Sequence, residues 1–157
     1  MNADFVNPFI ESIYDLFHTM LSAKVTRTGI GVSDGQRKPA EVMAIIGFSG
    51  MIRGTVGLAL PAPTCAAMVQ RLLGDLADTS DETASDTIGE LVNIVAGAAK
   101  AKLSAKVKQT LDLSLPVVFS GDQYEVYSPS QAVWLEVPFS SELGDLAVRL
   151  TFQSNAA

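Results

Sequence analysis

The fold of this chain is decided by one stretch, Asp86-Thr-Ile-Gly-Glu90-Leu-Val-Asn93-Ile-Val-Ala-Gly97-Ala-Ala-Lys100. At about 100° per residue in an α-helix, its polar residues gather within about 80° of one another. This polar stripe consists of Asp86, Glu90, Asn93, Gly97, Lys100 and, just beyond the stretch, Ser104. The opposite side consists of Ile88, Leu91, Val92, Val95 and Ala99. The pattern predicts an amphipathic helix, which we expect to run from about residue 81 to about residue 106.

The composition of the polar stripe is not that of an ordinary solvated helix face. Glu90 and Asn93 place a carboxylate and a carboxamide one turn apart, where a solvated face would carry Lys, Arg and Gln. Gly89 and Gly97 lie beside them, although each glycine costs a helix about 1 kcal/mol relative to alanine. Residues this small let the backbone of another molecule come close. We therefore interpret the stripe as a docking surface that exposes two functional groups.

The composition of the whole chain limits the kind of protein it can be. It has 157 residues, of which 48% are hydrophobic, so we expect a single domain over residues 1–157 with a substantial core. The net charge is −6 and Lys and Arg form no cluster, so neither a nucleic acid nor an anionic membrane is expected as a partner. Cys65 is the single cysteine, and neither Cys nor His recurs at metal-ligand spacing, so no metal site is expected.

The chain is expected to stay in the cytoplasm. Its amino terminus has no basic region followed by an apolar run, so no export signal is predicted. The most hydrophobic window, 42–60, is interrupted by Gly47, Gly50, Arg53 and Gly54, which we interpret as a turn between two strands. No clear sequence repeat is present.

The remaining segments predict two further helices and a set of strands. Asn7-Pro8 is typical of a helix start, with Asn7 as the cap, and apolar residues follow at helical spacing as far as Leu21. Another helix is predicted from Thr64 to Leu73, ending at Gly74. Strands are predicted at 25–32, 41–48, 54–60, 113–119, 124–127, 132–139 and 146–152. We therefore expect an α+β fold, a mostly antiparallel sheet with its helices packed on one face.

Four residues at fixed intervals match a known motif. Asp86, Glu90, Asn93 and Pro116 follow the order Asp or Ser, three residues, Glu, two residues, Asn, twenty-two residues, Pro. This is the signature of the CheC/CheX/FliY family of phosphatases, which dephosphorylate the chemotaxis response regulator CheY. The chain resembles that family over most of its length, including the segments 7–10, 50–54 and 115–121. The resemblance implies a CheC-like fold.

The resemblance is to the CheX pattern of one centre per chain. CheC-like members carry a second Glu/Asn pair on their first helix, whereas here Glu11 is followed three positions on by Tyr14. Asp4 and Asn7 also have the spacing of such a pair, but the proline that follows favours Asn7 as a helix cap. One Glu/Asn pair, Glu90 with Asn93, is therefore expected to carry the activity.

The activity that the resemblance implies is hydrolysis of the aspartyl phosphate of a CheY-like receiver domain. Asn93 is expected to orient the attacking water, and Glu90 to form a salt bridge with the regulator's active-site lysine. Contact with the partner is expected from Asp86, Gly97 and Lys100 of the stripe and from Gly89 beside it. Asp86 can also be explained by the helix dipole. No cofactor is expected in this chain, and Mg²⁺ is expected on the partner regulator. The resemblance further implies a homodimer joined at its sheet edges.

A second interpretation is a non-catalytic binding module that docks on a receiver domain or a flagellar switch component through the same stripe. Asn93 distinguishes the two, because a pure binding surface does not require a carboxamide at that position. A structural partner in a sensory cluster is a third interpretation, but it would need a more apolar stripe. Pro116 is expected to have a structural role at a strand start or edge.

Overall fold

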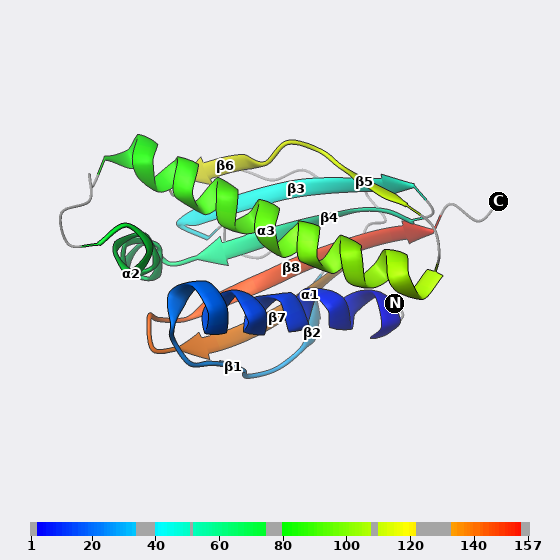
Figure 1. The fold of residues 1–157 in the computed structure, drawn as a ribbon, viewed down its shortest axis with the longest axis horizontal. Helices are drawn as coiled ribbons and strands as arrows, with labels where there is room; N and C mark the ends of the chain where they lie inside the picture. The colour runs from blue at the N-terminus through cyan, green and yellow to red at the C-terminus, as the bar shows by residue number, and fades with distance from the viewer. Residues whose placement is uncertain are drawn as a thin grey trace.

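In the computed structural model, an antiparallel sheet is covered on one face by helices (Figure 1). The structure describes residues 3–33, 40–50, 52–74, 80–107, 110–121 and 133–154. The helical elements are α1 (Ala3–Leu16), the π-helix η1 (Phe17–Leu21), α2 (Ala62–Leu73) and α3 (Asp81–Val107). The strands are β1 (Val25–Arg27), β2 (Gly31–Ser33), β3 (Val42–Gly50), β4 (Ile52–Leu60), β5 (Leu111–Leu113), β6 (Val117–Ser120), β7 (Trp134–Ser141) and β8 (Leu146–Ser154). The predicted α+β fold is confirmed.

The sheet is arranged as two related halves. Its strand order is β1-β7-β8-β4-β3-β5, with β2 also paired to β7 and β6 also paired to β3. Read from the opposite edge, the order is β5-β3-β4-β8-β7-β1. The hairpin β3–β4 then takes the place of the hairpin β7–β8, and β5 takes the place of β1. Each pair of short edge strands joins the hairpin of the other half of the chain. The fold is therefore internally two-fold, which the sequence does not reveal as a repeat.

The two long helices follow the same correspondence. The buried residues of the first helical segment, α1 and the start of η1, include Phe9, Ser12, Ile13, Leu16 and Phe17. The same spacing in α3 gives Ile88, Leu91, Val92, Val95 and Ala96, all of them buried. Glu11 and Tyr14 therefore occupy in α1 the positions that Glu90 and Asn93 occupy in α3.

Both sheet edges are interrupted by a bulge at corresponding places. Between Arg27 and Gly31, the chain of β1 and β2 has one residue more than the β7 segment it pairs with. Between Leu113 and Val117, the chain of β5 and β6 has one residue more than the β3 segment it pairs with. An extra residue of this kind interrupts the ladder and bends the strand locally.

The bulges correct the predicted strands at 25–32 and 113–119, each of which is two short strands. The N–H groups of Thr28 and Ser114 donate hydrogen bonds to the carbonyls of Pro138 and Gly47, both at 2.9 Å. Thr28 and Ser114 are thus the first residues of equivalent bulges. A single inserted residue leaves the composition of a strand unchanged, which is why the apolar pattern alone does not show it.

The predicted start of the first helix is wrong. α1 begins at Ala3, so Asn7 is a helical residue rather than a cap, and Pro8 lies inside the helix. Proline has no N–H to donate to the preceding turn, a loss that disfavours it there. The additional turn stays helical because Val6 is buried, with 4% of its surface exposed. Burial of one apolar side chain thus outweighs the local capping signal.

The other predicted elements agree with the structure, with one adjustment. The hairpin is confirmed, but its turn is tighter than expected, because β3 extends to Gly50 and β4 begins at Ile52. α2 ends before Gly74 as expected, and Cys65 on this helix is buried, which raises the pKa of its thiol. The predicted strand at 124–127 lies outside the described residues. No helix within the described ranges is long and apolar enough to cross a membrane.

Replacing Gly54 with alanine is expected to destabilise the fold. Gly54 lies between Phe48 on β3 and Phe152 on β8, whose rings pack 5.4 Å apart between centroids. An added Cβ would collide with the carbonyl oxygen of Thr151 and with the Phe48 ring. Gly54→Ala should therefore lower the free energy of unfolding in urea by about 1–3 kcal/mol.

The matched control for this prediction is Gly31→Ala on β2, where an added Cβ meets nothing within 4 Å. This variant should change the free energy of unfolding by less than about 0.5 kcal/mol. Equal stability of the two variants would contradict the close approach at Gly54.

Candidate functional site

α3 lies across the helical face of the sheet beside α1 (Figure 1). The five residues of its predicted apolar side are buried, with at most 2% of any of them exposed: Ile88, Leu91, Val92, Val95 and Ala99. At the start of the helix, the hydroxyl of Ser80 accepts a hydrogen bond from the N–H of Thr83 at 3.2 Å. This contact caps α3. The apolar side thus fixes the rotation of the helix and determines which residues face outward.

The polar stripe lies on the outer side of α3 as far as Lys100, as its spacing predicts, whereas the hydroxyl of Ser104 is buried. Asp86, Glu90 and Asn93 are exposed, while Gly97 and Lys100 are half-buried. Within the described part of the chain, neither the Glu90 carboxylate nor the Asn93 carboxamide forms a hydrogen bond or an ion pair. The carboxylate and the carboxamide are therefore available to a second molecule.

Gly97 in the stripe and Gly89 beside it have different surroundings. Gly89 is buried, and a Cβ at this position would lie 3.5 Å from Val118 and 3.9 Å from Pro116. At Gly97 an added Cβ meets nothing within 4 Å. Gly89 thus faces the bulged sheet edge, whereas Gly97 leaves open space on the outer side. Pro116, the last residue of the sequence motif, lies directly before β6 at this edge.

The corresponding positions on α1 are occupied by internal contacts. The Tyr14 hydroxyl accepts a hydrogen bond from the N–H of Arg27 at 2.9 Å, and its ring packs edge-on to Phe139. Lys102 on α3 forms ion pairs with Glu11 at 3.5 Å and with Asp15 at 3.3 Å. The hydrogen bond with Asp15 is the main cause that raises the pKa of Lys102. The first half of the fold therefore has a tyrosine where the second half exposes a carboxamide.

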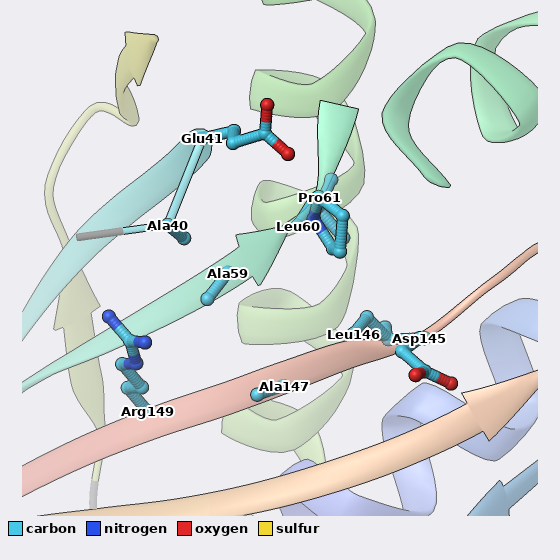
Figure 2. Close-up of a pocket in the computed structure, with 9 residues that line it drawn as sticks. All are labelled: Ala40, Glu41, Ala59, Leu60, Pro61, Asp145, Leu146, Ala147 and Arg149. Atoms are coloured by element: carbon cyan, nitrogen blue, oxygen red, sulfur yellow. The ribbon is translucent and has the colours of Figure 1, made fainter. Parts of the chain in front are cut away.

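A pocket of about 340 Å³ lies on the other face of the sheet, away from α3 (Figure 2). No residue of the polar stripe lines it. Two of its charged groups have structural contacts: Glu41 accepts a hydrogen bond from the N–H of Ala62, and Arg149 pairs with Glu136 at 3.3 Å. Among the described residues, no three His, Cys, Asp or Glu side chains are close enough to hold a metal ion. The pocket is therefore separate from the candidate site.

The side chains of the stripe can position other groups: a water molecule and a cationic side chain. A carboxamide both donates and accepts hydrogen bonds, so Asn93 can hold a water molecule in a fixed orientation. A carboxylate accepts hydrogen bonds from a cationic side chain, so Glu90 can pair with a lysine or arginine of another molecule. The two groups are carried one turn apart by a helix whose opposite side is fully packed. The site thus fits a second molecule that brings the reacting group.

Comparisons with known proteins confirm the family resemblance. The family model described as chemotaxis phosphatase CheX matches residues 42–140, a range that includes all four motif residues. A curated relative, the CheY-P phosphatase CheX of Thermotoga maritima, is 28% identical over 141 residues, which cover 89% of each chain. The sequence signal that identified the candidate residues thus lies within the matched region.

Solved structures show the same fold. A CheC-like superfamily protein from Shewanella sp. PV-4 superposes with a TM-score of 0.86 at 29% identity, over 98% of this chain and 100% of that chain. The CheX-CheY-BeF3-Mg²⁺ complex from Borrelia burgdorferi contains a chain with a TM-score of 0.76 at 22% identity, over 96% of this chain and 98% of that one. At 22% identity, the similarity to the chain in the Borrelia burgdorferi complex shows a shared fold.

Replacing Gly97 with alanine is expected to stabilise the protein. The position is in the middle of α3 and leaves room for a methyl group. Since alanine favours a helix over glycine, Gly97→Ala should raise the free energy of unfolding by about 0.5–1 kcal/mol. The reverse change at an exposed position of the same helix, Ala101→Gly, should lower it by a similar amount. A destabilised Gly97→Ala variant, measured by urea unfolding, would contradict the open space beside this residue.

Proposed function

This chain belongs to the CheX family of chemotaxis phosphatases, and on that premise we propose that it hydrolyses the aspartyl phosphate of a CheY-like receiver domain. The observation that carries the proposal is the exposed Glu90 and Asn93 pair, unpartnered within the described residues and held on the outer side of a packed helix. The similarity to the CheY-P phosphatase CheX of Thermotoga maritima supports the same activity.

The reaction transfers a phosphoryl group from an aspartate to water. A water oxygen forms a new bond to phosphorus opposite the leaving carboxylate, the bond from phosphorus to the aspartyl oxygen breaks, and free phosphate and the original aspartate result. In this proposal the receiver domain contributes the acyl phosphate, its own lysine and a bound Mg²⁺, and the chain itself needs no cofactor. An oriented water is the component left for this chain to supply.

Asn93 supplies that orientation. Its side chain is exposed and points away from the packed side of α3, so it can enter the active site of a docked receiver domain. There the carboxamide can accept a hydrogen bond from the attacking water and donate one to the phosphoryl group. Holding the water in line with the bond that breaks converts an encounter in solution into a positioned reaction.

Glu90 fixes the register of the complex. One turn before Asn93, its carboxylate can pair with the lysine of the receiver's active site. The same type of contact exists within this chain, where Glu11 at the corresponding position of α1 pairs with Lys102. A glutamate at this helix position can thus hold a lysine that approaches from a neighbouring element.

Asp86 fits a contact with the partner better than a role in the helix dipole. α3 begins at Asp81, and the acidic residues of its first turn are Asp81 and Glu82. The dipole effect falls off beyond the first turn, which Asp86 lies outside. In the proposed complex Asp86, Gly97 and Lys100 extend the docking surface along the outer side of α3, and Gly89 supports it from the side of β6.

A homodimer joined at its sheet edges completes the proposal. The sheet has two outer edges, one formed by β1 and β2 and the other by β5 and β6. Both are short, and both carry exposed apolar side chains, Val32 on β2 and Val117 on β6 among them. Association of such edges would cover unpaired strand groups.

Replacing Asn93 with alanine is expected to abolish most of the turnover while leaving binding intact. Because the carboxamide acts by positioning the water, Asn93→Ala should lower kcat by about 10²-fold or more. The measurement is the release of radiolabelled phosphate from candidate receiver domains of the same organism at a catalytic ratio of this protein. Near-normal turnover of the variant would eliminate the water-orienting role. Binding of wild-type protein to a phosphorylated receiver without faster hydrolysis would favour the docking-module interpretation.

Replacing Glu90 with alanine is expected to weaken the complex. Loss of the ion pair with the receiver's lysine should raise KM by about tenfold, and it should lower the affinity for a receiver activated with beryllofluoride by a similar factor. Glu11→Ala is the matched control, since it removes the corresponding carboxylate of α1 and should leave KM unchanged. Unchanged affinity of Glu90→Ala in the titration would show that Glu90 does not contact the lysine.

A further inference from the structure

The bulge between β5 and β6 exposes a large apolar side chain beside the candidate site. Leu115 has 86% of its surface exposed, more than any other large hydrophobic residue in the described part of the chain. Val117, two positions on, is 52% exposed. A single exposed leucine needs no explanation by itself. Its rigidity and its position beside the candidate site together indicate a function.

Leu115 is held in a fixed position. The N–H of Ser114 donates to the carbonyl of Gly47 at 2.9 Å, and the N–H of Gly47 donates to the Ser114 hydroxyl at 2.8 Å. The same hydroxyl donates to the carbonyl of Leu115 at 3.2 Å. These hydrogen bonds fasten the bulge to β3, so the leucine side chain is presented outward from a rigid backbone. A pre-organised apolar group loses little conformational freedom when a partner covers it.

The bulge adjoins the face of α3 that carries the carboxamide. Pro116 lies 3.9 Å from the place where a Cβ of Gly89 would be. Gly89 directly precedes Glu90, and Asn93 lies one turn beyond Gly89 on the same side of the helix. A molecule that covers Asn93 from this side therefore meets the bulge as well. Leu115 directly precedes Pro116, so it belongs to the segment that adjoins this side of α3.

The two halves of the fold provide an internal comparison. Leu115 corresponds to Gly29 in the bulge between β1 and β2, because the two bulges begin at Thr28 and Ser114. In that half α1 carries Tyr14, hydrogen-bonded to Arg27, where α3 carries Asn93. The half without the carboxamide thus has no side chain where the other half exposes a leucine. That half does expose an apolar side chain in its bulge, Ile30 at 55%, but at the position that corresponds to Pro116, so only the second half presents one at the position of Leu115.

A second copy of this chain does not fit as the occupant of this part of the edge. Leu115 and Pro116 lie in the bulge, outside the ladder, and Pro116 has no N–H with which to extend a sheet. Bulges and prolines protect sheet edges from association with other strands. What remains available at Leu115 is its side chain, which suits a folded partner with an apolar patch.

We propose that Leu115 is an apolar docking contact for the receiver domain, next to the point where that domain presents its phosphoryl group to Asn93. This inference rests on the proposed function and adds a residue to its partner surface. The receiver patch that it requires is apolar and lies beside the phosphorylated aspartate. Leu115 contributes to affinity and orientation and takes no part in the chemical step.

Replacing Leu115 with serine tests the docking contact. Leu115→Ser should raise KM for a phosphorylated CheY-like receiver of the same organism about tenfold and leave kcat within about twofold, because removal of an apolar contact weakens binding without changing the reaction. Leu115→Met keeps an apolar side chain and should retain the wild-type KM. The matched control is Val133→Ser, directly before β7, where a side chain that is 51% exposed lies away from the edge of β5 and β6 and should not affect KM.

Two further measurements separate the possible outcomes. Sedimentation of the same variants identifies the occupant: a change of oligomeric state in Leu115→Ser with an unchanged KM would assign the leucine to a second copy and overturn the proposal. Titration with a beryllofluoride-activated receiver does not depend on turnover. If the wild-type protein binds but does not hydrolyse, weaker binding of Leu115→Ser would still support the docking contact while the phosphatase activity fails. Unchanged KM, affinity and oligomeric state in Leu115→Ser would refute it.

Discussion

Burial of the apolar side of α3 is the constraint on which the rest of the site depends. Each large side chain that leaves water there, such as Leu91 or Val92, contributes about 1.5–3 kcal/mol. Any other rotation of the helix would expose these side chains and press Glu90 into the core, where an unpaired carboxylate is costly. The helix therefore has one favourable rotation on the sheet, and that rotation sets the direction of Asn93. Packing energy in the core thus determines geometry at the surface.

The same framework is used twice in one chain, with different results. Both halves have a long helix, a central hairpin and a bulged edge, and in both a glutamate occupies the same helix position. In the first half, Glu11 is taken up by Lys102 and the tyrosine at position 14 bonds to the backbone of β1. In the second half, the pair at 90 and 93 has no such contacts within the described residues. The first half therefore uses these two helix positions for internal contacts that stabilise the fold, and the second half exposes the same two positions to a partner.

Much of the fold follows from the sequence because the signals are long and periodic. The apolar spacing of α3 and the hydrophobic window that forms β3 and β4 extend over many residues, and the helix and the hairpin were both correctly predicted. The start of α1 was not, because the local signal of Asn7-Pro8 is outweighed by the burial of Val6, a tertiary effect. The bulges were missed because one inserted residue does not alter the composition of a strand.

The candidate site was predicted in a different way from the fold. Periodicity shows that Glu90 and Asn93 share a helix face, but their proposed roles come from the spacing of the family motif through Pro116. The structure adds what neither signal contains. The family comparison places Glu11 and Tyr14 where a second pair would lie, but the two-fold correspondence of the sheet and its bulges does not appear in the sequence, because residues such as Gly29 and Leu115 share no chemistry.

The bulge between β5 and β6 both limits strand pairing at its sheet edge and presents a side chain to a partner. A bulge breaks the ladder at a sheet edge, so pairing with other strands is confined to the short strands on either side of it. Because a bulge interrupts the alternation of side chains along a strand, a residue in the bulge can direct its side chain where a residue of a regular strand cannot. In the bulge between β1 and β2 the corresponding position is Gly29, and the neighbouring Ile30 is the exposed apolar residue. At β5 and β6 this position is occupied by Leu115, fastened through Ser114 to β3 and adjoining α3 through Pro116. The bulge between β5 and β6, which interrupts the sheet edge, therefore also gives the second half of the fold a rigid surface beside Glu90 and Asn93.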